Sequence, residues 1–190
     1  MEDISLHVLD IIQNSISAGA SCVDIAIKEI PADHSLYVMI SDNGTGMDSS
    51  EAERSLDPFY TTRTTRRVGL GLPLFKAQAE ASGGSLEIDT EKGRGTTVMA
   101  RFDTRSIDCL PLGRMEDTMA TLILCHPDIE FRYTHSYYDK CFEFSTQDIK
   151  GKLGDLLISD LSVIGWIRKY ISENIEKLYG GVASEVDSGT

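Results

Sequence analysis

The sequence is poor in basic residues and contains no long apolar run. Lysine and arginine together number 18 against 30 aspartates and glutamates, which gives a formal net charge of −12. No basic cluster is large enough for nucleic acid or an anionic membrane surface, so we expect neither as a partner. A membrane span needs about 18 consecutive apolar residues, and the sequence has no such run. The N-terminus, MEDISLHVLD, is acidic where a secretory signal is positively charged, so we expect a cytoplasmic protein.

Cysteine is scarce as well. The four cysteines contain no CxxC pair, whereas zinc-binding modules usually supply their ligands in closely spaced pairs. We expect reduced thiols, as in other cytosolic chains, and the sequence leaves open a zinc set of Cys109, Cys125, His126 and Cys141. No Ser-His-Asp or Cys-His signature has a recognisable local context, so hydrolases of those classes are not indicated.

What the sequence does contain is the composition of an ordinary folded protein. Hydrophobic residues make up 41% and charged residues 25% of the 190 residues, which argues against a disordered or fibrous chain. A chain of this length can bury one substantial core and a small second unit.

Apolar spacing predicts helices and antiparallel strand pairs over the first hundred residues. Repeats at three- and four-residue spacing indicate amphipathic helices, and alternation of apolar and polar residues indicates half-buried strands. The predicted elements are helices over 4–18, 48–55 and 71–81 and strands over 22–30, 35–41, 85–90 and 96–102. Strands grouped in hairpins, with helices available for one face, indicate an α+β fold arranged as a two-layer α/β sandwich.

One stretch of this region shows no periodic spacing of apolar residues. The sequence PFYTTRTTRRVGLG, residues 58–71, predicts a loop. Loops of about a dozen residues in a compact domain usually have a function. Arg63, Arg66 and Arg67 cluster in it, and they could form a solvated surface or contact an anionic ligand.

Polar residues from three separate segments suit a nucleotide. Asp10 and Asn14 are four positions apart, so both project from one side of the first helix. Asp42 ends a predicted strand and leads into the turn sequence Gly44-Thr45-Gly46. The segment Gly69-Leu70-Gly71-Leu72 leads into a helix N-terminus, where backbone N–H groups and the helix dipole favour phosphate. A carboxylate, a neutral oxygen ligand and a glycine-rich anion site together predict a nucleotide pocket.

The order and spacing of these segments resemble those of the GHKL ATPase superfamily, which is shared by histidine kinases, gyrase B, Hsp90 and MutL. LHVLDIIQNSISAGA resembles the N box, DNGTGM the first glycine box, PFYTTR the F box, VGLGLPLFKAQAEASGGSL the second glycine box and GRGTTVMARF the closing strand. The resemblance covers residues 4–102. It implies a Bergerat-type ATP-binding fold, in which a mixed, mainly antiparallel sheet carries helices on one face.

The family's residue roles, placed on this sequence, imply a site for ATP and Mg²⁺. Asn14 would bind Mg²⁺ through its side-chain oxygen, and Asp42 would accept a hydrogen bond from the exocyclic amine of adenine. The glycines would let the backbone approach the base and the phosphates, and Thr96 would lie beside Asp42. The implied ATP contacts are Asn14, Asp42, Gly44, Gly46, Met47, Phe59, Thr61, Thr62, Arg63, Gly69, Leu70, Gly71, Leu72 and Thr96.

Asp10 is the candidate catalytic residue. The hydrolysing members of the superfamily have glutamate at this position, where it positions and deprotonates the attacking water. Aspartate has the same charge but is one methylene shorter, and a base must come within hydrogen-bond reach of its proton, so hydrolysis could be slow. The alternative is that Asp10 is a helix-surface acid without a role. Two further departures are Ser17, where many relatives have aspartate, and Leu72, which is often serine in the kinases.

The second half predicts a separate small α+β unit without a catalytic set. Its predicted elements are helices over 112–125 and 159–179 and strands over 129–137 and 140–146. We therefore divide the chain into an ATP-binding domain, a small α+β interaction domain and a disordered tail, at residues 1–104, 105–180 and 181–190. The second domain could bind a protein partner or form a homodimer.

Three functions follow from the resemblance. The chain could transfer phosphate from Mg-ATP to a histidine, serine or threonine of a partner protein, and we favour this reading because the glycine box is closer to the kinase form. It could instead be a slow ATPase that acts as a conformational switch, or a sensor that binds adenine nucleotides without chemistry. Over its whole length the chain also resembles small stand-alone ATP-binding proteins encoded beside iron-only hydrogenases.

Overall fold

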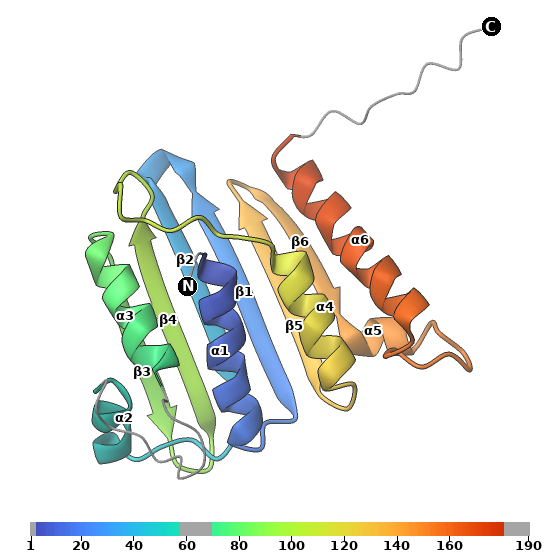
Figure 1. Cartoon of the computed structure of the whole chain (residues 1–190), viewed down its shortest axis with the longest axis horizontal. Coiled ribbons are helices and arrows are strands. Elements are labelled where there is room, and N and C mark those ends of the chain that lie inside the picture. Colours follow the sequence, from blue (N-terminus) through green and yellow to red (C-terminus); the bar gives the residue numbers. More distant parts are fainter. Residues whose placement is uncertain (1–2, 58–69, 181–190) are drawn as a thin grey trace, which may run out of the picture.

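The computed structural model describes residues 3–57 and 70–180, in which six strands form one sheet in the order β3-β4-β2-β1-β5-β6 (Figure 1). The helices are α1 (Ile4–Ser17), α2 (Ser49–Ser55), α3 (Gly71–Ala81), α4 (Met115–Cys125), α5 (Thr146–Lys150) and α6 (Leu161–Leu178), with a 3-10 turn over Pro31–Asp33. The strands are β1 (Cys22–Ile30), β2 (Ser35–Asp42), β3 (Ser85–Glu91), β4 (Gly95–Asp103), β5 (Glu130–Tyr137) and β6 (Lys140–Ser145).

Helix α1 forms where the apolar spacing predicted it. The carboxylate of Asp3 caps it by accepting a hydrogen bond from the backbone N–H of Leu6 at 3.1 Å. Beyond its end, Gly19 adopts a φ of 75°, which glycine reaches without steric cost. The apolar stripe of the helix is at most 2% exposed and consists of Ile4, Val8, Ile11 and Ile12. Burial of this stripe holds α1 against the sheet.

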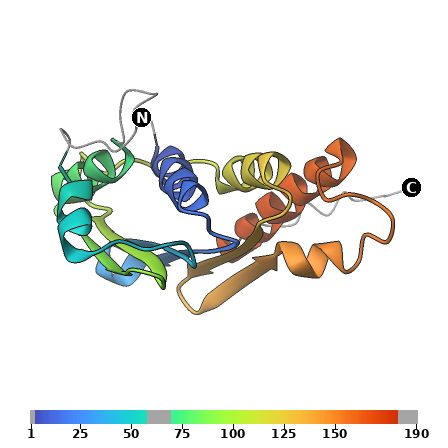
Figure 2. The same cartoon turned by 90° about the horizontal axis from the view of Figure 1, so that it is seen from below.

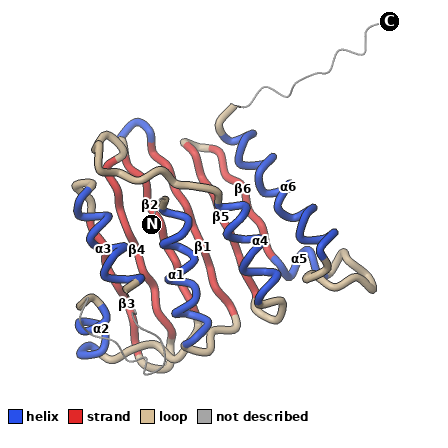
Figure 3. Tube along the Cα trace, in the orientation of Figure 1, coloured by secondary structure: helices blue, strands red, loops and turns tan. Residues whose placement is uncertain are grey.

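The sheet is mixed and mainly antiparallel, as predicted. The two hairpins β1–β2 and β3–β4 form, and β2 also pairs antiparallel with β4, whereas β5 runs parallel to β1. Figure 3 shows the strands side by side in one layer. Figure 2 shows α1, α3 and α4 together on one side of that layer. The two-layer α+β sandwich is therefore confirmed.

The second half of the chain extends the same sheet. Eight residue pairs join β5 to β1, from Cys22 with Glu130 to Glu29 with Tyr137, and α6 packs against α4. One continuous hydrophobic core includes side chains from both halves. The predicted boundary at residue 104 thus falls between β4 and α4, but residues 105–180 do not form a sheet of their own. Their role in interaction or dimerisation stays a prediction, and the predicted tail over 181–190 lies outside the described residues.

Two local details differ from the predicted elements. The predicted strand over 140–146 ends at Ser145, because the Ser145 hydroxyl accepts a hydrogen bond from the N–H of Asp148 at 3.3 Å and begins the short helix α5. The 3-10 turn over Pro31–Asp33 lies inside the first hairpin. Both features depend on a single capping or proline residue, which apolar spacing does not report.

The described part of the chain lacks two features that would have changed the functional reading. Between residues 3 and 180, outside the gap at 58–69, no helix combines the length and apolar character needed to cross a bilayer. Within the same ranges no group of three or more histidines, cysteines or acids is placed to hold a metal ion, and the cysteines are free thiols. The structure therefore does not bring Cys109, Cys125, His126 and Cys141 together as a metal-binding group.

A partly buried polar network joins the end of α6 to the sheet. His135 is fully buried, with its Nδ1 2.7 Å from the Tyr133 hydroxyl and its Nε2 2.9 Å from Oε1 of Glu29. The hydroxyl of Tyr179, just after α6, donates a hydrogen bond to the same Glu29 oxygen. Burial alone would raise the pKa of Glu29, but the hydrogen bonds from His135 and Tyr179 outweigh it, so the pKa lies below its ordinary value of 4.5.

This network predicts an acid-sensitive contribution to stability. Because folding lowers the pKa of Glu29, its stabilising effect is complete above pH 4.5 and is lost as the pH falls through the lower folded-state value. Glu29→Gln should therefore flatten the fall in unfolding free energy between about pH 7 and about pH 3, measured by urea titration. Glu87→Gln, an exposed change on β3, should keep the wild-type slope. Identical slopes for all three proteins would contradict the role of Glu29.

Candidate functional site

Helix α1 and the start of α3 lie against each other at Gly71. A Cβ atom on Gly71 would lie 3.2 Å from Cβ of Asp10 and 3.8 Å from Nδ2 of Asn14. The first distance is tighter than ordinary side-chain contacts, so glycine permits this close approach. Asp10 is exposed and Asn14 is half-buried. The structure therefore brings Asp10 and Asn14 together with Gly71 at the start of α3.

The N-terminus of α3 lies in this region. The residue before the helix, Leu70, makes no side-chain capping hydrogen bond, and the N–H groups of a first helical turn have no partner within the helix. Pro73 has no N–H to leave unsatisfied, and Leu74 donates to the carbonyl of Leu70 at 2.9 Å. The donors at Gly71 and Leu72 thus lie at the positive end of the helix dipole, beside Asp10 and Asn14.

Asp42 is held at the end of β2 by two hydrogen bonds. The Ser15 hydroxyl donates to its Oδ2 at 2.6 Å, and the N–H of Gly44 donates to its Oδ1 at 2.9 Å. Each carboxylate oxygen keeps a lone pair that can accept a further hydrogen bond. Ser15 is buried and follows Asn14 directly on α1. One helix therefore contributes to both the predicted adenine end and the predicted phosphate end of the site.

The first glycine box runs between the end of α1 and the turn from β3 to β4. The N–H of Thr45 donates to the carbonyl of Ala18 at 3.0 Å, and Gly93 donates to the carbonyl of Thr45 at 2.7 Å. Gly46 has a φ of 62°, and a Cβ there would lie 2.1 Å from the Glu91 carbonyl oxygen. No side chain fits at that position without moving the backbone, so glycine is required.

Thr96 and Met47 belong to the predicted adenine end. Thr96 is the direct cross-strand partner of Asp42 in the β2–β4 pair, so the two side chains point to the same face. The N–H of Met47 donates to the hydroxyl of Thr90 at 2.9 Å. Thr96 therefore lies beside Asp42, and Met47 is connected to Thr96 through the Thr90 hydroxyl.

Leu72 and Ser17 are two positions at which the sequence departs from the family pattern, and the structure describes both. The side chain of Leu72 is only 8% exposed and packs in the core, so its backbone alone can contact a ligand. Ser17 is exposed and donates to the carbonyl of Gln13 at 2.7 Å. Five predicted ATP contacts lie outside the described residues, namely Phe59, Thr61, Thr62, Arg63 and Gly69.

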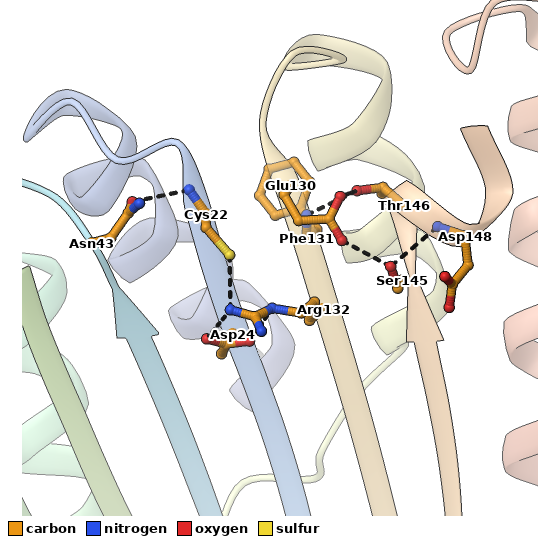
Figure 4. Close-up of polar contacts among 9 residues, drawn as sticks. All are labelled: Cys22, Asp24, Asn43, Glu130, Phe131, Arg132, Ser145, Thr146 and Asp148. Atoms are coloured by element: carbon orange, nitrogen blue, oxygen red, sulfur yellow. Dashed lines mark hydrogen bonds and ion pairs between the residues drawn. The ribbon is translucent and has the colours of Figure 1, made fainter. Parts of the chain in front are cut away.

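Asn43, which reads from sequence only as a turn residue, fixes the start of β1 (Figure 4). Its Oδ1 accepts hydrogen bonds from the N–H groups of Ser21 at 2.9 Å and Cys22 at 3.0 Å. The Cys22 sulfur is 3.0 Å from Nη2 of Arg132 on β5, which also forms an ion pair with Asp24 at 2.7 Å. The first glycine box is thus connected to the second half of the chain.

The same end of β5 is connected onward to α5. The carboxylate of Glu130 accepts hydrogen bonds from the hydroxyls of Ser145 at 2.8 Å and Thr146 at 2.6 Å (Figure 4). Thr146 is buried and accepts the N–H of Phe131 at 2.9 Å. These contacts were not predicted, because they join residues with no common local pattern.

The geometry agrees with comparisons to known proteins. The family model described as "Histidine kinase-, DNA gyrase B-, and HSP90-like ATPase" matches residues 2–106. The chain belongs to this ATPase family. The match covers α1, the first glycine box, α3 and β4, which are the elements that assemble around Asp42 and Gly71.

Relatives within the ATPase family include several bacterial kinases. The sensor histidine kinase WalK of Bacillus subtilis is 32% identical over 105 residues, which are 51% of this chain and 17% of WalK. The probable C4-dicarboxylate sensor kinase of the same organism is 33% identical over 80 residues, 42% of this chain and 15% of that kinase. The cell-division control histidine kinase PdhS of Brucella abortus is 29% identical over 115 residues, 54% of this chain and 11% of PdhS. The chain thus matches less than a fifth of the length of these relatives.

A solved structure has a similar fold. The crystal structure of the N-terminal domain of a DNA repair protein superposes with a TM-score of 0.52 at 17% identity, covering 75% of this chain and 52% of that one. At this identity the similarity concerns the fold alone. The separate resemblance to hydrogenase-associated proteins stays a prediction.

The hydrogen bond from Ser15 to Asp42 can be tested by substitution. Ser15→Ala removes a hydrogen bond to an ionised carboxylate, so it should lower the unfolding free energy by about 1.5–3 kcal/mol in urea titrations. Ser17→Ala, two residues further along the same helix but exposed, should change it by no more than about 0.5 kcal/mol. Equal effects of the two substitutions would show that Ser15 does not hold Asp42.

Proposed function

We propose that this chain binds Mg-ATP between Asp42 and Gly71 and transfers phosphate to a partner protein, on a histidine, serine or threonine. The observation that carries the proposal is the convergence on α1, where Asp10 and Asn14 adjoin Gly71 and the next residue, Ser15, holds Asp42. Segments far apart in the sequence thus meet along one helix. The named sensor and cell-division kinases among its relatives support transfer over the other outcomes.

The adenine end of the proposed site selects by hydrogen-bond polarity. Asp42 carries two oxygens that can each accept one more hydrogen bond beside those from Ser15 and Gly44. The exocyclic amine of adenine is a donor, whereas guanine has a carbonyl acceptor at that ring position. An acceptor facing an acceptor leaves both groups unsatisfied, which costs more than a lost hydrogen bond.

The phosphate end combines backbone donors with a neutral oxygen ligand. The N–H groups at the start of α3 suit phosphate oxygens, and Asn14 would hold Mg²⁺ through its side-chain oxygen, in keeping with the preference of this ion for oxygen ligands. Bound Mg²⁺ would neutralise charge on the phosphates. The close contact of Gly71 with Asp10 places an acid beside the same region.

Slow hydrolysis is the second candidate function. Asp10 is exposed and lies next to the start of α3, so its carboxylate could accept a proton from water as well as from a partner's hydroxyl or imidazole. The two outcomes differ only in which nucleophile reaches the phosphate. Positioning of the nucleotide and charge stabilisation would supply most of the acceleration in either case.

Asp42→Asn tests the binding site. The substitution replaces one acceptor oxygen by a donor, and we expect the binding free energy of ATP to weaken by about 1.5–3 kcal/mol, measured by isothermal titration calorimetry. Asp24→Asn is the matched control, because Asp24 lies on the neighbouring strand β1 and pairs with Arg132. Unchanged ATP affinity in Asp42→Asn would remove the proposed adenine contact.

Labelled ATP separates transfer from hydrolysis. With γ-labelled Mg-ATP and proteins co-purified with the chain, transfer predicts label on a partner and hydrolysis predicts free phosphate alone. Asp10→Asn should lower either rate by about 10²–10⁴-fold if Asp10 acts as the base. Its ATP affinity, by calorimetry, should change little. Full activity in Asp10→Asn would show that Asp10 is a surface acid without a role.

A further inference from the structure

Thr90 lies at the adenine end, in a row of side chains that crosses three strands. Asp42 on β2 pairs with Thr96 on β4, and Thr96 in turn pairs with Thr90 on β3. Directly paired residues of antiparallel strands point to the same face of the sheet. All three side chains are partly exposed. Thr90 lies outside the residues that the sequence assigned to the nucleotide.

The Thr90 hydroxyl makes three contacts, and only one arrangement of hydrogens satisfies all of them. Its Oγ1 lies 2.9 Å from the N–H of Met47, 3.0 Å from the carbonyl oxygen of Gly95 and 3.0 Å from Oγ1 of Thr96. The N–H can only donate and the carbonyl can only accept, so the single Thr90 proton goes to Gly95. Thr96 must then donate its own proton to Thr90.

This arrangement determines what Thr96 can offer a ligand. With its proton directed to Thr90, the Thr96 hydroxyl presents only lone pairs on its other sides. Asp42, its cross-strand partner, is an acceptor as well. The two neighbouring side chains therefore present acceptors without a donor between them, which suits an amine and opposes a carbonyl.

We propose that Thr90 is a specificity-determining positioning residue, which makes the site prefer adenine over guanine nucleotides by fixing the direction of the Thr96 hydroxyl. The inference rests on the proposed function, because it assumes that the base lies at Asp42 and Thr96. Without the Thr90 hydroxyl, the Thr96 hydroxyl loses its acceptor. It can then rotate and donate its hydrogen bond to the guanine carbonyl. Thr90 acts through Thr96 and need not contact the nucleotide.

The test compares ATP and GTP binding in variants of the full chain. Thr90→Val keeps the shape of the side chain but removes the hydroxyl, and it should lower the ratio of ATP to GTP affinity about tenfold, as expected for one hydrogen bond. Thr90→Ser keeps the hydroxyl and should retain the wild-type ratio. Thr90→Ala, which is smaller, provides a second variant without the hydroxyl should Thr90→Val fold poorly. Calorimetry with both nucleotides gives each ratio.

Thr97→Val is the matched control. Thr97 follows Thr96 on β4, and its hydroxyl forms a hydrogen bond with that of Ser41 on β2 at 2.8 Å. The variant therefore also removes a hydrogen bond between hydroxyls of neighbouring strands. Its position is on the other face of the sheet, and its nucleotide ratio should equal that of wild type.

The possible outcomes distinguish a failure of the role of Thr90 from a failure of the proposed function. A wild-type protein that binds ATP, with an unchanged ratio in Thr90→Val and Thr90→Ala, overturns the role of Thr90 and leaves the proposed function standing. Equal losses of ATP and GTP affinity also overturn it, because they indicate structural support only. A wild-type protein that binds neither nucleotide overturns both.

Discussion

The packing of α1 on the sheet is the constraint on which the site depends. Each fully buried isoleucine or valine of its inner stripe contributes about 1.5–3 kcal/mol of transfer free energy, and four such residues fix the position and rotation of the helix. With the inner stripe fixed, the adjoining side of the helix must present Asn14 to α3 and Ser15 to Asp42. The proposed adenine and phosphate ends are therefore aligned by hydrophobic burial, before any ligand contributes.

Much of the first half could be predicted from the sequence because its signals are local. Three- and four-residue spacing located α1 and α3, and alternation located the strands of both hairpins to within one residue or so. Asp42, Gly44 and Gly46 could be assigned because their order along the chain is characteristic of the ATPase family. The structure adds a physical reason for Gly46, whose backbone lies too close to Glu91 for any side chain.

The rest could not be predicted because it depends on contacts between distant residues. Alternation identifies β5 as a strand, but it cannot tell whether that strand pairs with β6 alone or also with β1. Ser15 and Thr90 are ordinary polar residues in sequence, and their importance comes from a carboxylate and a second hydroxyl that folding brings beside them. Asn43 likewise looked like a turn former, whereas its amide fixes the beginning of β1.

The parallel pairing of β1 with β5 has a consequence for how the protein can be divided. The family match ends at residue 106, which invites a cut between the two halves. Such a cut would remove β5 and make β1 an edge strand. Its backbone amide and carbonyl groups along Cys22–Ile30 that face β5 would then be unpaired. An unpaired edge strand can form backbone hydrogen bonds with strands of other molecules. In the whole chain β5 occupies this side of β1, so the second half covers a strand edge that would otherwise be open to pairing with other molecules.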